Sequence, residues 1–122
     1  MSAGAARRKG KPTPPDDYVP TGLILYMADQ ALPRVLAWIP GIHAAVDHGI
    51  DPVSRHARAI VYVSASPSSP AITGLVITLR AYDDPLYGVL DGNRVVECED
   101  LGDAIREVAV KVEAAGQLSL AL

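Results

Sequence analysis

The chain of 122 residues has the length of a single domain, and its composition, 49% hydrophobic and 20% charged, excludes a protein that is disordered throughout. A single cysteine, Cys98, excludes an intramolecular disulfide and a zinc site built from cysteines. The net charge of −3 is divided unevenly: residues 1–20 hold four basic and two acidic residues, whereas the rest hold seven and twelve, so the larger part repels a phosphate backbone on average.

Residues 1–20 are rich in glycine, alanine, arginine and lysine and then in proline and aspartate, so they offer almost nothing to bury. This composition predicts a disordered basic tail before a single domain over residues 21–122. No apolar stretch follows the basic residues, and serines and prolines interrupt the longest uncharged run. With one cysteine besides, we expect a cytoplasmic protein that has neither a signal peptide nor a membrane span.

Residues 22–28 are a short apolar run that is typical of a strand, although a helical start also fits. Asp29 is a suitable N-cap for a helix that Pro40 and Gly41 then end. The apolar positions of this helix recur at helical spacing: Leu32, Val35, Leu36 and Ile39. Residues 42–48 fit either a second helix or a strand, and the alanines in this segment favour the helix.

The middle of the chain carries clear strand signals. Residues 59–64 are apolar on both faces, and residues 71–79 form a second strand in which Gly74 indicates a bulge. A turn at residues 83–85 follows. Two further strands then form a hairpin, because the Asp-Gly-Asn sequence between them supplies the left-handed conformations of such turns. These strands span residues 87–90 and 94–98.

A last helix begins after Asp100, its N-cap, and ends at Gly116. Its apolar stripe comprises Leu101, Ile105, Val108 and Val112. Three leucines then alternate along the chain, as in an edge strand or a docking segment, and are candidate interface residues: Leu118, Leu120 and Leu122.

These elements predict an α+β fold with a mostly antiparallel sheet of four or five strands, two or three helices packed on one face, and a disordered N-terminal tail. An uncovered second face of the sheet, or the terminal leucines, would offer a surface for self-association.

The densest run of metal-capable side chains lies between residues 43 and 56. On a helix, His43 and Asp47 would share a face and could bind one divalent metal, with His56 as a third ligand. No standard metal-binding motif includes these residues, and a polar connection whose imidazoles face solvent or cap carbonyls explains them better. We therefore predict no metal and no cofactor, and retain the three residues as candidates only.

A second cluster of carboxylates could hold Mg²⁺ for phosphodiester hydrolysis. It comprises Asp83, Asp84, Asp91, Glu97, Glu99, Asp100 and Asp103. Turn formation and the N-terminus of the last helix account for most of them. Cys98, between two glutamates, is expected to be a buried, unreactive thiol with a raised pKa, and Trp38 a core or interface residue. No catalytic residue is assigned.

The candidate nucleic-acid contacts are the basic residues of the tail, Arg7, Arg8, Lys9 and Lys11. No aromatic residue lies among them to stack on bases. We therefore expect a non-enzymatic interaction, adaptor or assembly subunit whose partner is a second copy or another protein. The alternatives are a metal-dependent hydrolase or nuclease that uses the His, Asp and Glu clusters, and a nucleic-acid-binding accessory protein that uses the basic arm.

Overall fold

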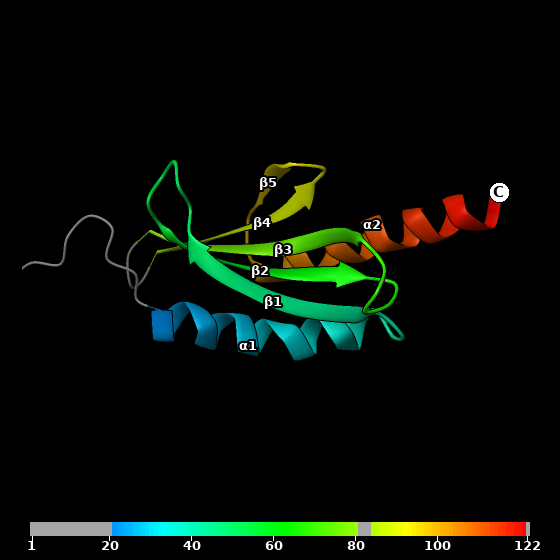
Figure 1. Cartoon of the computed structure of the whole chain (residues 1–122), viewed down its shortest axis with the longest axis horizontal. Helices are drawn as coiled ribbons and strands as arrows, with labels where there is room; N and C mark the ends of the chain where they lie inside the picture. Colours follow the sequence, from blue (N-terminus) through cyan, green and yellow to red (C-terminus); the bar gives the residue numbers. More distant parts are fainter. Residues whose placement is uncertain (1–20, 81–83, 122) are drawn as a thin grey trace, which may run out of the picture.

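The computed structural model describes residues 21–80 and 84–121, which form two helices and one sheet of five strands (Figure 1). The helices are α1 (Thr21–Trp38) and α2 (Leu101–Ala121), and the strands are β1 (His43–Ile50), β2 (Ala57–Ser64), β3 (Ala71–Leu79), β4 (Pro85–Asp91) and β5 (Arg94–Cys98). The strands follow the order of the chain, and each is antiparallel to the next. The expected α+β class with an antiparallel sheet is confirmed. No helix in these described ranges combines the length and the apolar character needed to cross a bilayer.

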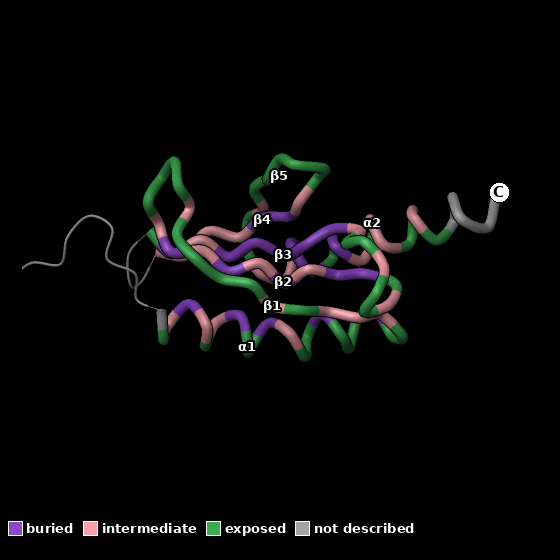
Figure 2. Tube along the Cα trace, in the orientation of Figure 1, coloured by how far each residue is buried: buried purple, intermediate pink, exposed green. Residues whose placement is uncertain are grey.

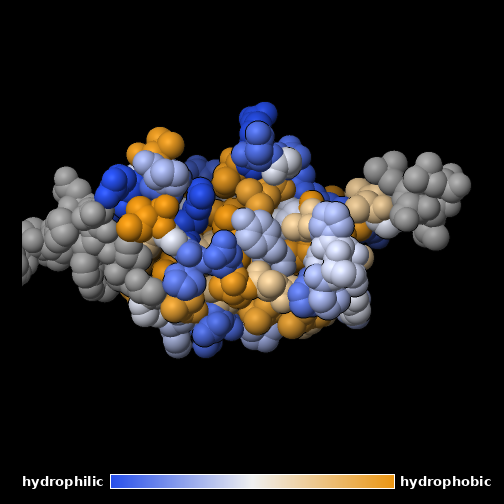
Figure 3. Space-filling model, in the orientation of Figure 1, coloured by the Kyte–Doolittle hydropathy of each residue, from blue (hydrophilic) through white to orange (hydrophobic). Residues whose placement is uncertain are grey.

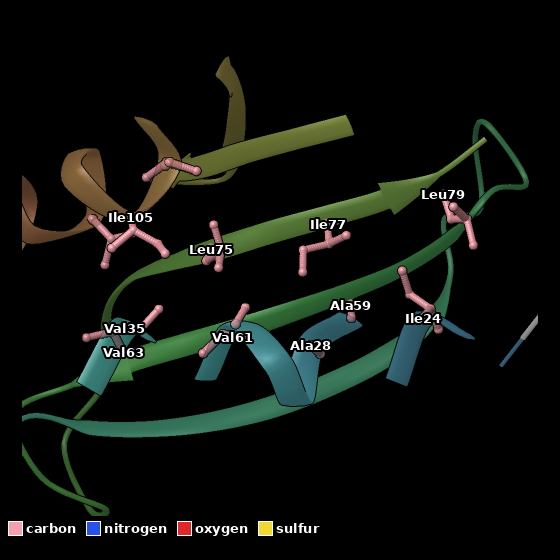
Figure 4. Packing of buried hydrophobic residues seen from close by; sticks show 14 of the residues in the cluster. Ile24, Ala28, Val35, Ala59, Val61, Val63, Leu75, Ile77, Leu79 and Ile105 are labelled. Atoms are coloured by element: carbon pink, nitrogen blue, oxygen red, sulfur yellow. The ribbon is translucent and has the colours of Figure 1, made fainter. Parts of the chain in front are cut away.

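One buried cluster joins the sheet and the helices (Figures 2 and 4). Each helix contributes one stripe, and β2 and β3 contribute every second residue, as strands do when one face is buried. The members from α1, β2, β3 and α2 are Ile24, Ala28, Ala31, Val35, Ala57, Ala59, Val61, Val63, Leu75, Ile77, Leu79, Ala104, Ile105 and Val108. Burial of a valine, leucine or isoleucine side chain contributes about 1.5–3 kcal/mol. We call the sheet face that carries these side chains the core face and the opposite one the outer face.

α1 begins earlier than the sequence predicts. Residues 22–28 are helical and not a strand, and Asp29 is an exposed residue within the helix instead of its N-cap. The fully buried positions of α1 follow the period of a helix: Ile24, Ala28, Ala31 and Val35. The helical alternative for residues 22–28 is therefore the right one, because the buried stripe already begins there.

Residues 42–48 lie mostly in a strand, although their alanines favour a helix. β1 pairs with β2 at every position, from His43 with Ser64 to Ile50 with Ala57. Pairing with β2 stabilises the extended conformation of this segment. Differences in helix propensity are below about 1 kcal/mol per residue, and tertiary contacts of this kind outweigh them.

The irregularity in the β2–β3 ladder does not lie at Gly74. The register shifts between Val63 and Ser64, which leaves Ile72 unpaired. Gly74 itself stays in the ladder, and a Cβ at this position would lie 2.8 Å from Cγ2 of Ile60. The glycine is therefore needed for close packing on the outer face and not for a bulge.

The hairpin and the start of the last helix are confirmed. Two residues connect the paired Asp91 and Arg94, and Gly92 has a φ of +66°. The N–H of Asp103 donates to Oδ1 of Asp100 over 2.8 Å, which is the hydrogen bond expected of an N-cap.

The end of α2 differs from the prediction. Gly116 does not end the helix, which continues to Ala121, so Leu118 and Leu120 lie in a helix and not in an edge strand. The backbone of α2 remains helical through Gly116. Three expectations concern residues outside the described ones: the tail over residues 1–20, the turn residue Asp83 and Leu122.

Candidate interaction surface

β1 forms one edge of the sheet, and its backbone groups point alternately toward β2 and away from it. In the adjoining turn, the N–H of Asp51 donates to the carbonyl oxygen of His56 over 2.9 Å. Asp51 and His56 continue the pairing of β1 with β2, so the odd-numbered residues of β1 are those that hydrogen-bond to β2. The even-numbered residues therefore direct their N–H and C=O groups away from the sheet.

A local hydrogen bond agrees with this alternation. The N–H of His48 donates to Oδ1 of the neighbouring Asp47 over 2.9 Å, as an outward-pointing group can. Within the described part of the chain no other strand lies on this side of β1, since β1 comes first in the sheet order. Ala44 and Val46 are thus positioned to exchange backbone hydrogen bonds with an incoming strand.

α1 places a row of leucines beside this edge. At 100° per residue, Leu25, Leu32 and Leu36 lie on one flank of the helix and Trp38 on the other. Trp38 faces α2, because the two line a common groove, and α1 packs against β1 and β2 (Figure 1). The leucine flank (Leu25, Leu32 and Leu36) therefore faces outward past β1. Leu36 is 40% exposed, and Leu25 and Leu32 are half-buried.

Three side chains of β1 point to the outer face, those of His43, Ala45 and Asp47, and Gly49 is the fourth residue on this face. Ala45 and Asp47 are exposed and His43 is half-buried. On a strand, positions four residues apart are separated by about 13 Å, so His43 and Asp47 cannot share one metal ion. His56 lies in the turn before β2. Among the residues that the structure describes, no group of three or more His, Cys, Asp or Glu side chains could hold a metal ion.

Four carboxylates of the acidic cluster, those of Asp84, Asp91, Asp100 and Asp103, make local contacts. The ion pairs are Asp84 with Arg80 at 2.6 Å, Asp91 with Lys111 at 3.2 Å, and Asp103 with Arg106. Asp100 caps α2, and Glu97 and Glu99 are exposed. Ion pairs at the surface contribute about 0–1 kcal/mol each, so these contacts shape turns and helix ends and do not assemble a magnesium site.

Cys98 has the expected direction of pKa shift, with a different cause. Burial raises the pKa of the Cys98 thiol, and the negative charges of Glu107 and Asp100 raise it further. Of the neighbours in sequence, Glu97 points to the opposite side of the strand and Glu99 lies beyond its end. The thiol therefore stays protonated at neutral pH and is a poor nucleophile.

Shallow hollows lie at the surface of the sheet and the helices, and one of about 270 Å³ lies beside the ion pair of Asp91 and Lys111. Another of about 190 Å³ lies on the outer face and is lined by Asp47, Arg58 and Tyr62 among others. A third, about 420 Å³, lies between the end of α1 and α2, where Trp38 and Val110 are each 56% exposed. Trp38 is therefore not a core residue. In the view of Figure 3, hydrophobic and hydrophilic residues are interspersed on the face turned toward the reader.

The β1 edge was missed at the level of sequence because residues 42–48 favour a helix. One signal could have identified the strand. Pro40 and Gly41 on one side and Asp51 and Pro52 on the other bound a stretch of strand length. The remaining candidates stay predictions: the side chains of Leu118 and Leu120 and the basic residues Arg7, Arg8, Lys9 and Lys11 are not among those described.

Comparisons of the chain with protein-family models, with curated proteins and with solved structures find no match. The function is therefore inferred from the geometry of the β1 edge and the leucine flank.

Proposed function

We propose that this chain is a non-enzymatic interaction or assembly subunit that binds a protein partner by accepting a strand at the β1 edge. One observation carries the proposal: an edge strand with outward backbone groups lies directly beside the leucine flank of α1. Added strands bind through main-chain hydrogen bonds, and the leucine flank supplies the apolar area that a strand pair alone lacks.

The proposal includes the arrangement of both helices against the core face. This is supported by the shared buried cluster, in which Val35 of α1 and Ile105 of α2 join the same alternating residues of β2 and β3 (Figure 4). With the core face covered, a partner is left the edge of β1 and the outer face. A cytoplasmic location accords with the single free thiol of Cys98.

Solution mass and amide exchange together test the proposal. In size-exclusion chromatography with light scattering, we expect a species heavier than the 12.9 kDa chain. In hydrogen-exchange experiments, the amides of Ala44 and Val46 should become protected as the protein concentration rises, because the partner strand then accepts their hydrogen bonds. The amides of Ala45 and Asp47, which bond to β2, serve as internal references that should be protected at every concentration.

A constant mass of 12.9 kDa up to about 100 μM, with Ala44 and Val46 unprotected throughout, would contradict association of the chain with itself. The described residues offer no specific support for the hydrolase or the nucleic-acid alternative.

A further inference from the structure

We infer that the partner of β1 is β1 of a second copy, paired antiparallel about a two-fold axis at Ala45. This inference rests on the proposed function and specifies the partner and the register. Most homodimers have two-fold symmetry, and a strand edge satisfies its own outward groups when it meets an identical edge antiparallel.

The faces of the sheet limit the registers that are allowed. Directly opposed residues of antiparallel strands point to the same face, so outer-face residues must oppose outer-face residues. A two-fold axis then passes between one residue of β1 and the same residue of the second copy. Moving the axis by one residue along β1 gives the next allowed register. The candidates near the middle of the strand place the axis at Ala45, Val46 or Asp47.

The charges on the outer face select among these three registers. With the axis at Asp47, two exposed carboxylates oppose each other, which is unfavourable. With the axis at Val46, Asp47 opposes Ala45 of the second copy. With the axis at Ala45, His43 opposes Asp47 of the second copy, and the same contact forms again on the other side of the axis. An imidazole N–H can donate to a carboxylate whether or not the ring is charged.

The backbone alternation of β1 fits the same register. Because the odd-numbered residues bond to β2, Ala45 would meet its equivalent as a non-hydrogen-bonded pair, in which the Cα atoms are about 4.5 Å apart. Exposed methyl groups suit so close an approach. The hydrogen bonds would then be exchanged between Ala44 and Val46 of the two copies, and the N–H of His48 could keep its bond to Asp47.

The leucine flank lies near the end of β1 at which the proposed axis passes. Only residues 39–42 connect α1 to β1, so the C-terminal half of α1 lies near the start of β1. A two-fold axis at Ala45 therefore brings Leu32 and Leu36 of the two α1 helices toward one another. Stable interfaces bury about 1,200–2,000 Å², which a single strand pair does not reach without such a helix contact.

Substitutions that exchange the side chains at positions 43 and 47 test the register. The His43→Asp variant puts two carboxylate pairs across the axis, and we expect its dimer dissociation constant to rise by about tenfold or more. The double variant, His43→Asp with Asp47→His, restores both contacts and should return the constant to within about threefold of the original. Asn93→Asp, which adds the same charge in the exposed β4–β5 loop, is the matched control and should change little.

Light scattering and sedimentation over a concentration series give the constants, and circular dichroism confirms that each variant is folded. A dimer that is insensitive to His43→Asp, or that the double variant fails to restore, overturns the register and leaves the proposed function standing. A wild-type chain that is monomeric at all concentrations overturns the pairing of β1 with a second copy, and the β1 edge would then have to accept a strand of a different protein.

Discussion

The two edge strands of the sheet, β1 and β5, both have outward-pointing backbone N–H and C=O groups. They differ in how easily another strand could pair with these groups. β1 has 8 residues, lies beside the leucine flank and carries small or polar residues on its outer face. β5 has 5 residues and exposes Arg94 and Glu97. Short, charged strands are a common way to protect an edge from pairing. In the proposed pairing, the sheet extends at β1 and stops at β5.

Side-chain packing on the outer face reinforces the contrast. Figure 1 shows the β4–β5 hairpin rising out of the plane of β1 to β3. At the centre of this hairpin, a Cβ on Gly88 would lie 2.8 Å from Cγ1 of Val95 and 3.0 Å from the carbonyl oxygen of Val96. β5 thus folds closely over β4 because Gly88 has no side chain, and this close packing occupies the outer face near β5.

Proline substitutions at matched positions on the two edge strands should give the largest difference in self-association. Ala44→Pro removes an outward N–H and no hydrogen bond to β2, so the monomer should fold while self-association weakens on the order of 10- to 100-fold, for two lost bonds per dimer. Glu97→Pro is the counterpart on β5. Its N–H also points outward, since the two-residue loop closes on the paired Asp91 and Arg94. Light scattering should show a lower mass for the first variant only, and equal loss in both would show that β1 is not the contact edge.

Glycine-to-alanine substitutions should show a difference between the two edge strands in the free energy of unfolding. Gly88→Ala forces a Cβ against the backbone of Val96 and should lower the free energy of unfolding by about 1–3 kcal/mol. Gly49→Ala on β1 meets nothing within 4 Å and should be neutral or slightly stabilising. Urea denaturation gives both values. Equal destabilisation by the two substitutions would mean that the close packing at β5 is not what distinguishes it.

Truncation of the leucine flank should have a smaller effect. Leu36→Ala removes apolar area that is 40% exposed in the monomer and buried twice in the proposed dimer, so the dissociation constant should rise roughly five- to tenfold. Tyr26→Ala is the control, because Tyr26 is 61% exposed on the side of α1 that is turned away from the sheet. Sedimentation measures both constants, and a larger effect at Tyr26 would place the contact on a different side of the helix.

The smallest effect concerns the turn that holds the end of β1 against β2. The Ser54 hydroxyl, 2.6 Å from Oδ2 of Asp51, and the Ser54 N–H lower the pKa of Asp51 below its usual 3.8. A lowered pKa in the folded state means that the carboxylate stabilises the fold above pH 3.8 and that this contribution is lost as the pH falls through the folded-state pKa. Ser54→Ala should therefore be less stable than wild type at pH 7, and urea denaturation should show that the difference shrinks as the pH falls through the folded-state pKa of Asp51. The part that remains at low pH reflects the bond from the His56 N–H to the Ser54 hydroxyl. A difference independent of pH would contradict this account.

Local signals explain which elements could be predicted from the sequence. β2, β3, the hairpin at Gly92 and the cap at Asp100 were predicted because each depends on residues within a few positions. The first turns of α1 were not, since their apolar run has no polar alternation and only its burial against the sheet reveals the helical stripe. β1 depends on pairing with β2, whose partner residues lie 7 to 21 positions along the chain, and its alanines carry no strand preference. The availability of its edge depends on where α1 and β5 lie, which no short segment encodes.

The meander topology also determines the order in which surfaces come into existence. Every strand pairs only with its neighbours in the chain, so the sheet can form by adding one hairpin at a time, a low-contact-order route that favours rapid folding. During synthesis, α1 and β1 leave the ribosome before the rest of the described elements, and β2 can pair with β1 while α2 is still being made. The leucine flank and the β1 edge are therefore exposed early on nascent chains, and the proposed pairing would let two chains translated from the same message associate there before either has closed its core.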